Sequence, residues 1–228
     1  MIRLFSLLSG LFFALCVPAS AQEGARILAI GDSLMAWHEA AGQSIADVVA
    51  ERLGEPVANR SVSGAKIIHA LPITGALGMR IDSQFQPKGW DWVIMTGGGN
   101  DLVFGCGCGA CERRMERMID ANGTRGKIPE LIARIRATGA RVVYIGYLRS
   151  PGVGSMIDAC LPMGNTLEAR IAAMAERDAG VTFLSLATLT PNGDRSMHGV
   201  DMIHPSVKAS RVIGMQVAQI IQKADKTR

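Results

Sequence analysis

The sequence predicts an α/β fold, a three-layer α/β/α sandwich around a parallel sheet of about five strands. Short apolar runs of strand length alternate along the chain with segments that carry apolar residues at helical spacing. This alternation is typical of parallel sheets that are covered by helices on both faces. Turn-forming or polar residues follow the apolar runs, and in such sheets ligands bind at the carboxyl ends of the strands. We therefore expect one α/β domain with its functional site at that edge.

Residues 1–21 have the organisation of a secretory signal peptide, so the domain is expected to span residues 22–228. Arg3 provides the charged start, Leu4–Val17 is an apolar run, and Ala19-Ser20-Ala21 is a small-residue cleavage site before Gln22. The sequence thus predicts a periplasmic or secreted protein.

A retained membrane anchor and a lipid anchor on Cys16 are the alternatives to cleavage. The apolar run contains serines and a glycine and is shorter than the roughly 20 residues that cross a bilayer. Bulky Leu15 precedes Cys16, where a lipoprotein signal is expected to carry a small residue. We therefore expect no stable membrane anchor after signal removal.

Composition limits the function classes. The remaining chain of about 200 residues suits one domain with a sizeable core. The formal net charge of +4 falls to +3 when Arg3 is removed with the signal. The basic residues are scattered rather than gathered in a stripe, which argues against nucleic acid as a partner. We find no internal repeat and expect no cofactor.

The first strand and the turn after it organise the chain. Ile27–Ile30 is an apolar run too short to show a helical period, and Gly31 allows a sharp turn that leaves Ser33 at the strand's carboxyl end. Gly-Asp-Ser-Leu alone is a weak signal, because these residues also form ordinary turns. A helix is then predicted from Ser44 to Gly54, with one apolar face formed by Ile45, Val48, Val49 and Leu53.

Two further strands follow. Pro56–Val62 is extended and is followed by a turn that contains Gly64. This residue is either a plain turn glycine or a point of tight backbone approach. Residues 66–88 are interpreted as a short helix and loop. Residues 90–95 then form a central strand, and residues 96–101 a flexible turn that places the Asn100 amide at the same edge as Ser33.

The second half continues the same alternation. Ile128, Leu131, Ile132 and Ile135 form a helical face that ends at Gly139, and Val142–Ile145 is a strand. Residues 148–163 form a loop suited to line a pocket. Asn165 and Glu168 resemble a capping box for a helix that buries Leu167, Ile171 and Met174, before a last strand at residues 181–184. After a polar loop over residues 190–203, Pro205 suits the first turn of a closing helix whose Ile213, Val217 and Ile220 face inward.

The mature chain contains four cysteines, Cys106, Cys108, Cys111 and Cys160. In an exported chain an even number favours disulfides, with a zinc site and free thiols as alternatives. We expect Cys160 to pair with one of the other three, and not Cys106 with Cys108, because one intervening residue strains the bridge. Residues 105–110 also have the spacing Gly-x-Gly-x-x-Ala, but they lie about ten residues beyond the strand, where a dinucleotide fingerprint does not belong.

The strand ends together offer the groups that acyl transfer requires. A serine such as Ser33 needs an imidazole to accept its proton, the imidazole needs an acceptor to hold its tautomer, and the oxyanion needs donors in place. Asp201 lies three residues before His204, so one tight turn can hold both. The alternative to a catalytic pair is a helix-cap aspartate beside a surface histidine. The position of the Asp-x-x-His pair before the closing helix favours the catalytic interpretation.

At this point the sequence resembles the SGNH (GDSL) hydrolase superfamily, which includes exported bacterial esterases and lipases. Residues 31–34, 59–64, 98–101 and 201–205 are similar to its first, second, third and fifth blocks, in order and over nearly all of the mature chain. The resemblance implies a three-layer α/β/α sandwich, with Ser33 as nucleophile, His204 as general base and Asp201 as its orienting carboxylate. It also implies an oxyanion hole made by the Ser33 and Gly64 backbone N–H groups and the Asn100 side chain.

Two departures leave the substrate open. Residues 35–38, Met-Ala-Trp-His, differ from the small, glycine-rich continuation of the esterase branch, and the insertion at residues 106–111 is not a general family feature. Met35 also stands where the α/β-hydrolase elbow Gly-x-Ser-x-Gly needs glycine. Because the loops near Ser33 and Asn100 are polar and glycine-rich, we expect an esterase for short acyl groups, above all O-acetyl groups of glycans.

The alternatives are a lipase or thioesterase for longer chains, and a non-catalytic binding protein with this fold. Trp37 and His38 could contact a sugar ring, or Trp37 could pack under the first helix.

Overall fold

The computed structural model describes residues 24–227, so the predicted signal peptide and Cys16 lie outside the described residues. The β-strands are β1 (Ile27–Ile30), β2 (Val57–Asn59), β3 (Trp92–Met95), β4 (Arg141–Ile145) and β5 (Val181–Leu184). The α-helices are α1 (Ser33–Ala36), α2 (Ile45–Leu53), α3 (Pro72–Thr74), α4 (Ile81–Gln84), α5 (Gly99–Cys106), α6 (Glu112–Met118), α7 (Lys127–Arg136), α8 (Leu161–Ala175) and α9 (Val207–Asp225). Short turns of 3₁₀-helix at Glu39–Ala41 and Asp158–Cys160, and one of π-helix at Gly75–Met79, complete the list.

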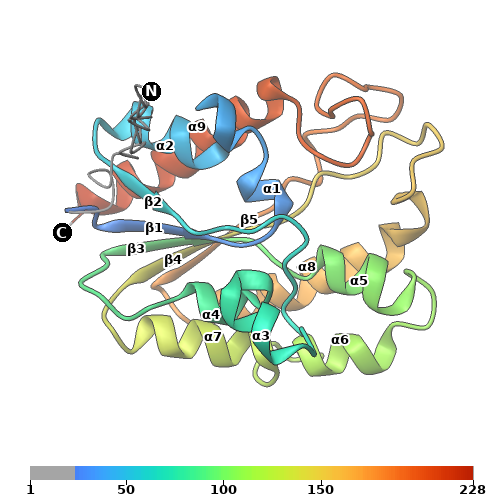
Figure 1. The fold of residues 1–228 in the computed structure, drawn as a ribbon, viewed down its shortest axis with the longest axis horizontal. Helices are drawn as coiled ribbons and strands as arrows, with labels where there is room; N and C mark the ends of the chain where they lie inside the picture. Colours follow the sequence, from blue (N-terminus) through green and yellow to red (C-terminus); the bar gives the residue numbers. More distant parts are fainter. Residues whose placement is uncertain (1–23, 228) are drawn as a thin grey trace, which may run out of the picture.

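All five strands form one parallel sheet in the order β2-β1-β3-β4-β5, which confirms the predicted fold class. Helices α2 and α9 cover one face, and α4, α7 and α8 lie on the other (Figure 1). The order reverses at β1, because the chain leaves β1 to form β2 on one side and returns to form β3 on the other. This reversal is the point at which open α/β sheets bind ligands.

Alternate residues of each strand enter two separate cores. In β1, Ile27 and Ala29 pack toward α2 and α9, whereas Leu28 and Ile30 pack toward the opposite layer. Because both faces are covered, the strand is apolar throughout rather than alternating. Gly214 of α9 brings its helix very close to α2, since a Cβ atom there would lie 2.6 Å from the Cβ of Val48.

Helix α2 follows its sequence signals closely. Ser44 caps it, and a capping box joins Ser44 to Asp47. Gly54 ends it in the left-handed region at φ 71°, a conformation that glycine adopts without steric cost.

Other boundaries were predicted wrongly. Helix α8 begins at Leu161, with Pro162 in its first turn, so Asn165 and Glu168 lie inside the helix and form no capping box. Asn165 instead accepts a hydrogen bond from Arg149 (2.9 Å), and Glu168 accepts one from the backbone N–H of Tyr147 (3.0 Å). Tertiary hydrogen bonds thus use the side chains that a capping box would have used.

The segment after β3 is not a flexible turn throughout, because helix α5 begins at Gly99 and includes Asn100 in its first turn. Strand β3 begins at Trp92 rather than residue 90, and β2 is shorter than predicted. Residues 66–88 contain two short helices and a π-helical turn, and α6 was not predicted.

Helix α9 also begins later than predicted. Its cap is Ser206, whose side chain accepts from the N–H of Ala209, so Pro205 precedes the helix. Ile220 is half-buried, and its neighbour Ile221 is fully buried. Within residues 24–227, no helix combines the length and apolarity that a membrane span needs.

Candidate active site

The turn after β1 has room only for glycine at its first position. Gly31 has φ +146°, and a Cβ atom there would lie 2.6 Å from Cγ2 and 2.8 Å from the carbonyl oxygen of Thr96. Buried Gln84 holds the same residue from both sides: its Oε1 accepts from the Gly31 N–H at 2.7 Å, and its Nε2 donates to the Gly31 carbonyl at 2.9 Å. The end of β1 therefore runs directly against the end of β3, and Ser33 begins helix α1 at this edge.

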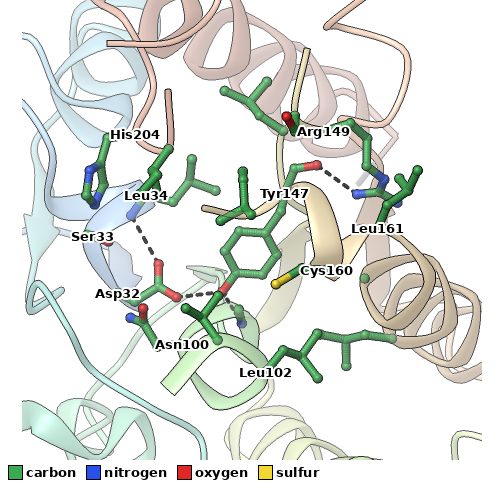
Figure 2. A pocket seen from close by; sticks show the side chains of 18 of the residues that line it. Asp32, Ser33, Leu34, Asn100, Leu102, Tyr147, Arg149, Cys160, Leu161 and His204 are labelled. Carbon is green, nitrogen blue, oxygen red and sulfur yellow. Dashed lines mark hydrogen bonds between the residues drawn. The ribbon is translucent and has the colours of Figure 1, made fainter. Parts of the chain in front are cut away.

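Asp32 connects the Ser33 turn to two other segments. Its Oδ1 caps α1 by accepting from the Leu34 N–H at 3.1 Å, and its Oδ2 accepts from the Tyr147 hydroxyl at 2.5 Å. The Tyr147 oxygen in turn accepts from the Gly99 N–H at 2.9 Å. This series of hydrogen bonds joins the segments after β1, β3 and β4, and Figure 2 shows the bond between Asp32 and Tyr147 among the side chains that line a pocket.

Burial dominates the electrostatics of this pair. It raises the pKa of Asp32 to about 6, against the hydrogen bonds from Tyr147 and Leu34 that lower it. Burial and the adjacent Asp32 charge raise the pKa of Tyr147 well above its ordinary value. Tyr147 thus keeps its proton at neutral pH and can act as the donor.

The loop before α9 brings Asp201 and His204 together as predicted. His204 Nδ1 lies 2.5 Å from Asp201 Oδ2, and Asp201 Oδ1 accepts from the N–H groups of Ile203 and His204, each at 3.0 Å. Burial acts to raise the pKa of Asp201, but these hydrogen bonds outweigh it and lower the pKa to about 2. Because an ionised carboxylate only accepts, Nδ1 carries the hydrogen and Nε2 presents a lone pair.

Ser33, Asn100 and His204 line one pocket, and Figure 2 shows Ser33 beside His204 at its rim. The remaining lining is mainly apolar and comes from five segments, around Leu34, Leu102, Leu148, Leu161 and Ile203. The cavity measures about 110 Å³. Because one water needs roughly 10–15 Å³ of such volume, the cavity has room for several waters.

The predicted oxyanion donors lie in different surroundings. Ser33 opens α1, and the first amides of a helix have no intrahelical acceptor. Asn100 donates one amide hydrogen to the Ala65 carbonyl at 3.0 Å, which leaves its second hydrogen available. Gly64 is absent from the pocket lining but directly precedes Ala65 and has φ +81°.

Asp101 fixes the Gly64 segment relative to Asn100. The buried Asp101 carboxylate accepts from the N–H groups of Ile67 at 2.7 Å and Ile68 at 2.9 Å. The glycines before Asn100 allow close packing, since a Cβ on Gly98 would lie 2.8 Å from Leu167 and one on Gly99 would lie 2.8 Å from Tyr147.

The cysteines form two pairs at disulfide distance. Cys106 pairs with Cys111 (Cα–Cα 5.3 Å) and Cys108 with Cys160 (Cα–Cα 4.7 Å), in agreement with the expected partner set for Cys160. Among residues 24–227, no group of His, Cys, Asp or Glu is arranged to hold a metal ion. Cys160 itself lines the pocket, so the second pair ties the loop after α5 to the pocket wall.

Two supporting residues were missed from the sequence. Gln84 lies in a short helix without a recognisable pattern, and only the fold brings it to Gly31. Tyr147 had a weak signal, because it follows β4 in the way that Ser33 follows β1.

Comparisons with known proteins identify the family of this chain. Residues 29–212 match the GDSL-like Lipase/Acylhydrolase family. Among curated proteins, no match was found.

Several solved structures share the fold. A carbohydrate acetylesterase from Sinorhizobium meliloti has a TM-score of 0.60 at 17% identity, over 87% of this chain and 98% of that one. A psychrotrophic esterase from Pseudoalteromonas sp. has a TM-score of 0.60 at 16% identity, over 88% and 98%. A carbohydrate esterase family 2 enzyme with a carbohydrate-binding domain, from Corynascus thermopiles, has a TM-score of 0.59 at 18% identity, over 87% and 65%. At these identities the structures show the fold, whereas the family match spans most of the sequence. The chain therefore belongs to the GDSL-like lipase/acylhydrolase family.

Proposed function

We propose that this chain is an exported serine esterase in which Ser33, His204 and Asp201 act as a catalytic triad. The observation that carries the proposal is that Ser33 and His204 line the same pocket while His204 Nδ1 lies 2.5 Å from the Asp201 carboxylate. That contact leaves Nε2 as the proton acceptor, which is the tautomer that a serine nucleophile requires.

The proposed reaction proceeds in two acyl transfers. Ser33 Oγ bonds to the ester carbonyl carbon while its proton passes to His204 Nε2, and collapse of the tetrahedral intermediate releases the alcohol with that proton. Water then attacks the acyl-enzyme carbonyl while His204 accepts its proton, and the second tetrahedral intermediate collapses by breaking the bond to Ser33 Oγ, which releases the carboxylic acid and regains the proton from His204. The Ser33 N–H, the Asn100 amide and the Gly64 N–H are the proposed oxyanion donors, of which Gly64 has the least support because it does not line the pocket.

For the substrate, we propose esters of short acyl chains, with O-acetyl groups on glycans first. The support is the polar, glycine-rich sequence near Ser33 and Asn100 and the fold shared with two carbohydrate esterases. Export is proposed from the signal-like residues 1–21.

One observation favours longer acyl chains as the second candidate. The pocket beside Ser33 is lined by leucines and other apolar side chains and measures about 110 Å³. An acetyl methyl group does not need that much apolar surface, and each further buried CH₂ would contribute about 0.8 kcal/mol. A medium-length chain is therefore the competitor to acetyl.

A covalent probe tests the catalytic proposal. The mature protein is treated with a fluorophosphonate and the adduct is mapped by peptide mass spectrometry, with Ser33→Ala and His204→Ala as controls. We expect one adduct, on Ser33, which disappears in both variants. Labelling of another serine would reject the assigned triad, and absence of labelling on folded protein would favour a binding protein.

The substrate is tested by chain length. kcat/KM is compared for p-nitrophenyl acetate, butyrate, octanoate and palmitate, and acetate release is measured from acetylated glycans. A maximum at acetate supports the first candidate, and a steady rise towards octanoate supports the second.

A further inference from the structure

Trp37 lies directly against the proposed catalytic base. It follows helix α1, and its backbone N–H donates to the Ser33 carbonyl at 2.9 Å. Its ring stacks on that of His204, with the ring centroids 3.7 Å apart and the planes 5° from parallel. The residue was expected either to contact a sugar or to pack under the first helix; the structure instead places one face of its ring on an imidazole.

His38 contacts the loop that carries His204 at a second point, Pro205. It has a left-handed backbone (φ 68°), and its Nε2 donates to the carbonyl of Pro205 at 3.0 Å. The residues that follow the nucleophile helix thus contact both His204 and the residue after it. Because Ser33, Trp37 and His38 belong to one short segment, a shift of the His204 loop relative to Ser33 would break the stack and this hydrogen bond together.

We propose that Trp37 is a positioning residue that fixes the plane of the His204 ring and stabilises the imidazolium that forms when Ser33 loses its proton. This inference rests on the proposed triad. The face of an indole carries negative charge density, so it attracts a cation more strongly than a neutral ring. In the proposed reaction His204 accepts the Ser33 proton and becomes cationic, so the stack strengthens in the transition state.

This preference for the transition state separates the proposal from a role in substrate binding. An interaction that strengthens only in the transition state changes kcat, whereas a platform for a sugar ring would change KM for glycan esters and leave kcat for small esters intact. The proposal therefore predicts a kcat effect on a substrate that contains no sugar.

The test compares Trp37→Leu and Trp37→Phe on p-nitrophenyl acetate. Loss of a partly buried cation–π contact predicts a fall in kcat of about 5- to 30-fold for Trp37→Leu, with KM within about twofold of wild type. Trp37→Phe keeps an aromatic face and should recover most of the rate. Phe104→Leu removes an exposed aromatic ring from α5 and is the matched control, expected to leave kcat and KM unchanged.

A direct readout does not depend on activity. Ring current from a parallel indole moves the His204 ring-proton resonances upfield, and with four histidines in the chain they can be assigned by comparison with His204→Asn. We expect the upfield shift in wild type and its loss in Trp37→Leu, with the fold checked by circular dichroism.

If Trp37→Leu does not fold, the wild-type spectrum and the kinetics of Trp37→Phe still test whether Trp37 positions His204. Absence of the upfield shift, unchanged kcat in Trp37→Leu, or an effect confined to KM would overturn the inference. Failure of the triad is distinguishable, because it would appear as absence of the Ser33 adduct in wild type.

Discussion

Replacement of Asp32 by Asn should change how stability depends on pH. Asp32 is 1% exposed, and burial raises its pKa to about 6 from an ordinary value of 3.8. Asn keeps the helix-cap function, because its carbonyl oxygen can accept from the Leu34 N–H as the carboxylate does. The substitution therefore removes the ionisation while it preserves the local hydrogen bond to the backbone.

The size of the effect follows from the difference in pKa. Well below pH 3.8, folded and unfolded chains both carry the proton on Asp32, and its ionisation costs nothing. As the pH rises from about 4 to 6, the unfolded chain releases the proton first, so the free energy of unfolding falls. About two pKa units at 1.36 kcal/mol each correspond to roughly 3 kcal/mol, and this cost remains in full above pH 6.

The assay is urea denaturation of wild type and Asp32→Asn at pH 4 and pH 7.5. We expect the stability of Asp32→Asn relative to wild type to be higher at pH 7.5 than at pH 4 by about 2 kcal/mol, because the unfolded carboxyl is already partly ionised at pH 4. Hydrogen bonding lowers the pKa of Asp120 and of Asp201 to about 2, so these groups contribute with the opposite sign, but both proteins share them. The difference between the two proteins isolates Asp32.

Tyr147→Phe is the companion variant. It removes the hydroxyl that donates to Asp32, so the pH at which the folded carboxyl ionises should move further upward. If wild type and Asp32→Asn have parallel stability profiles between pH 4 and pH 7.5, the carboxyl is not desolvated in the way the structure indicates, and this reasoning is wrong.

Three further predictions concern the oxyanion hole, the triad and the cysteines. Asn100→Ala should lower kcat by roughly 10²–10³ with the fold retained, measured on p-nitrophenyl acetate; wild-type kcat would remove Asn100 from the hole. Asp201→Asn should lower kcat on the order of 10⁴, because the wrong His204 tautomer is then favoured; a loss below tenfold would contradict the triad. Replacement of Cys108 and Cys160 by Ser should reduce the free energy of unfolding by about 4 kcal/mol, and replacement of the pair that closes the shorter loop, Cys106 and Cys111, by about 2 kcal/mol. Urea denaturation compares the two, and the reverse order would contradict the assigned pairs.

The fold and the positions of the candidate site residues could be predicted because their signals are local. A buried strand such as Ile27–Ile30 is apolar throughout, and the turn after it requires a glycine. Gly31 and Ser33 can therefore be identified from this short segment alone. Asp201 and His204 are similarly local, since three residues of chain bring their side chains into contact.

Helix boundaries were less predictable where tertiary contacts compete with local ones. Asn165 and Glu168 have the spacing of a capping box, yet both side chains bind the segment after β4 instead. The helix begins four residues before Asn165, at Leu161, so both side chains lie inside it and bind other segments instead of its first N–H groups.

By itself, the sequence determined the order of the strands along the chain, the glycine turns, and the Asp-x-x-His pair, because each depends on steric or hydrogen-bonding rules within a few residues. Only the tertiary structure decided that Gln84 clamps Gly31, that Tyr147 binds Asp32, and that Trp37 covers His204. These contacts join residues that are 53, 115 and 167 positions apart. Over such separations no local rule acts on the pair, and its distance is set by how the strands are ordered in the sheet and how the layers pack.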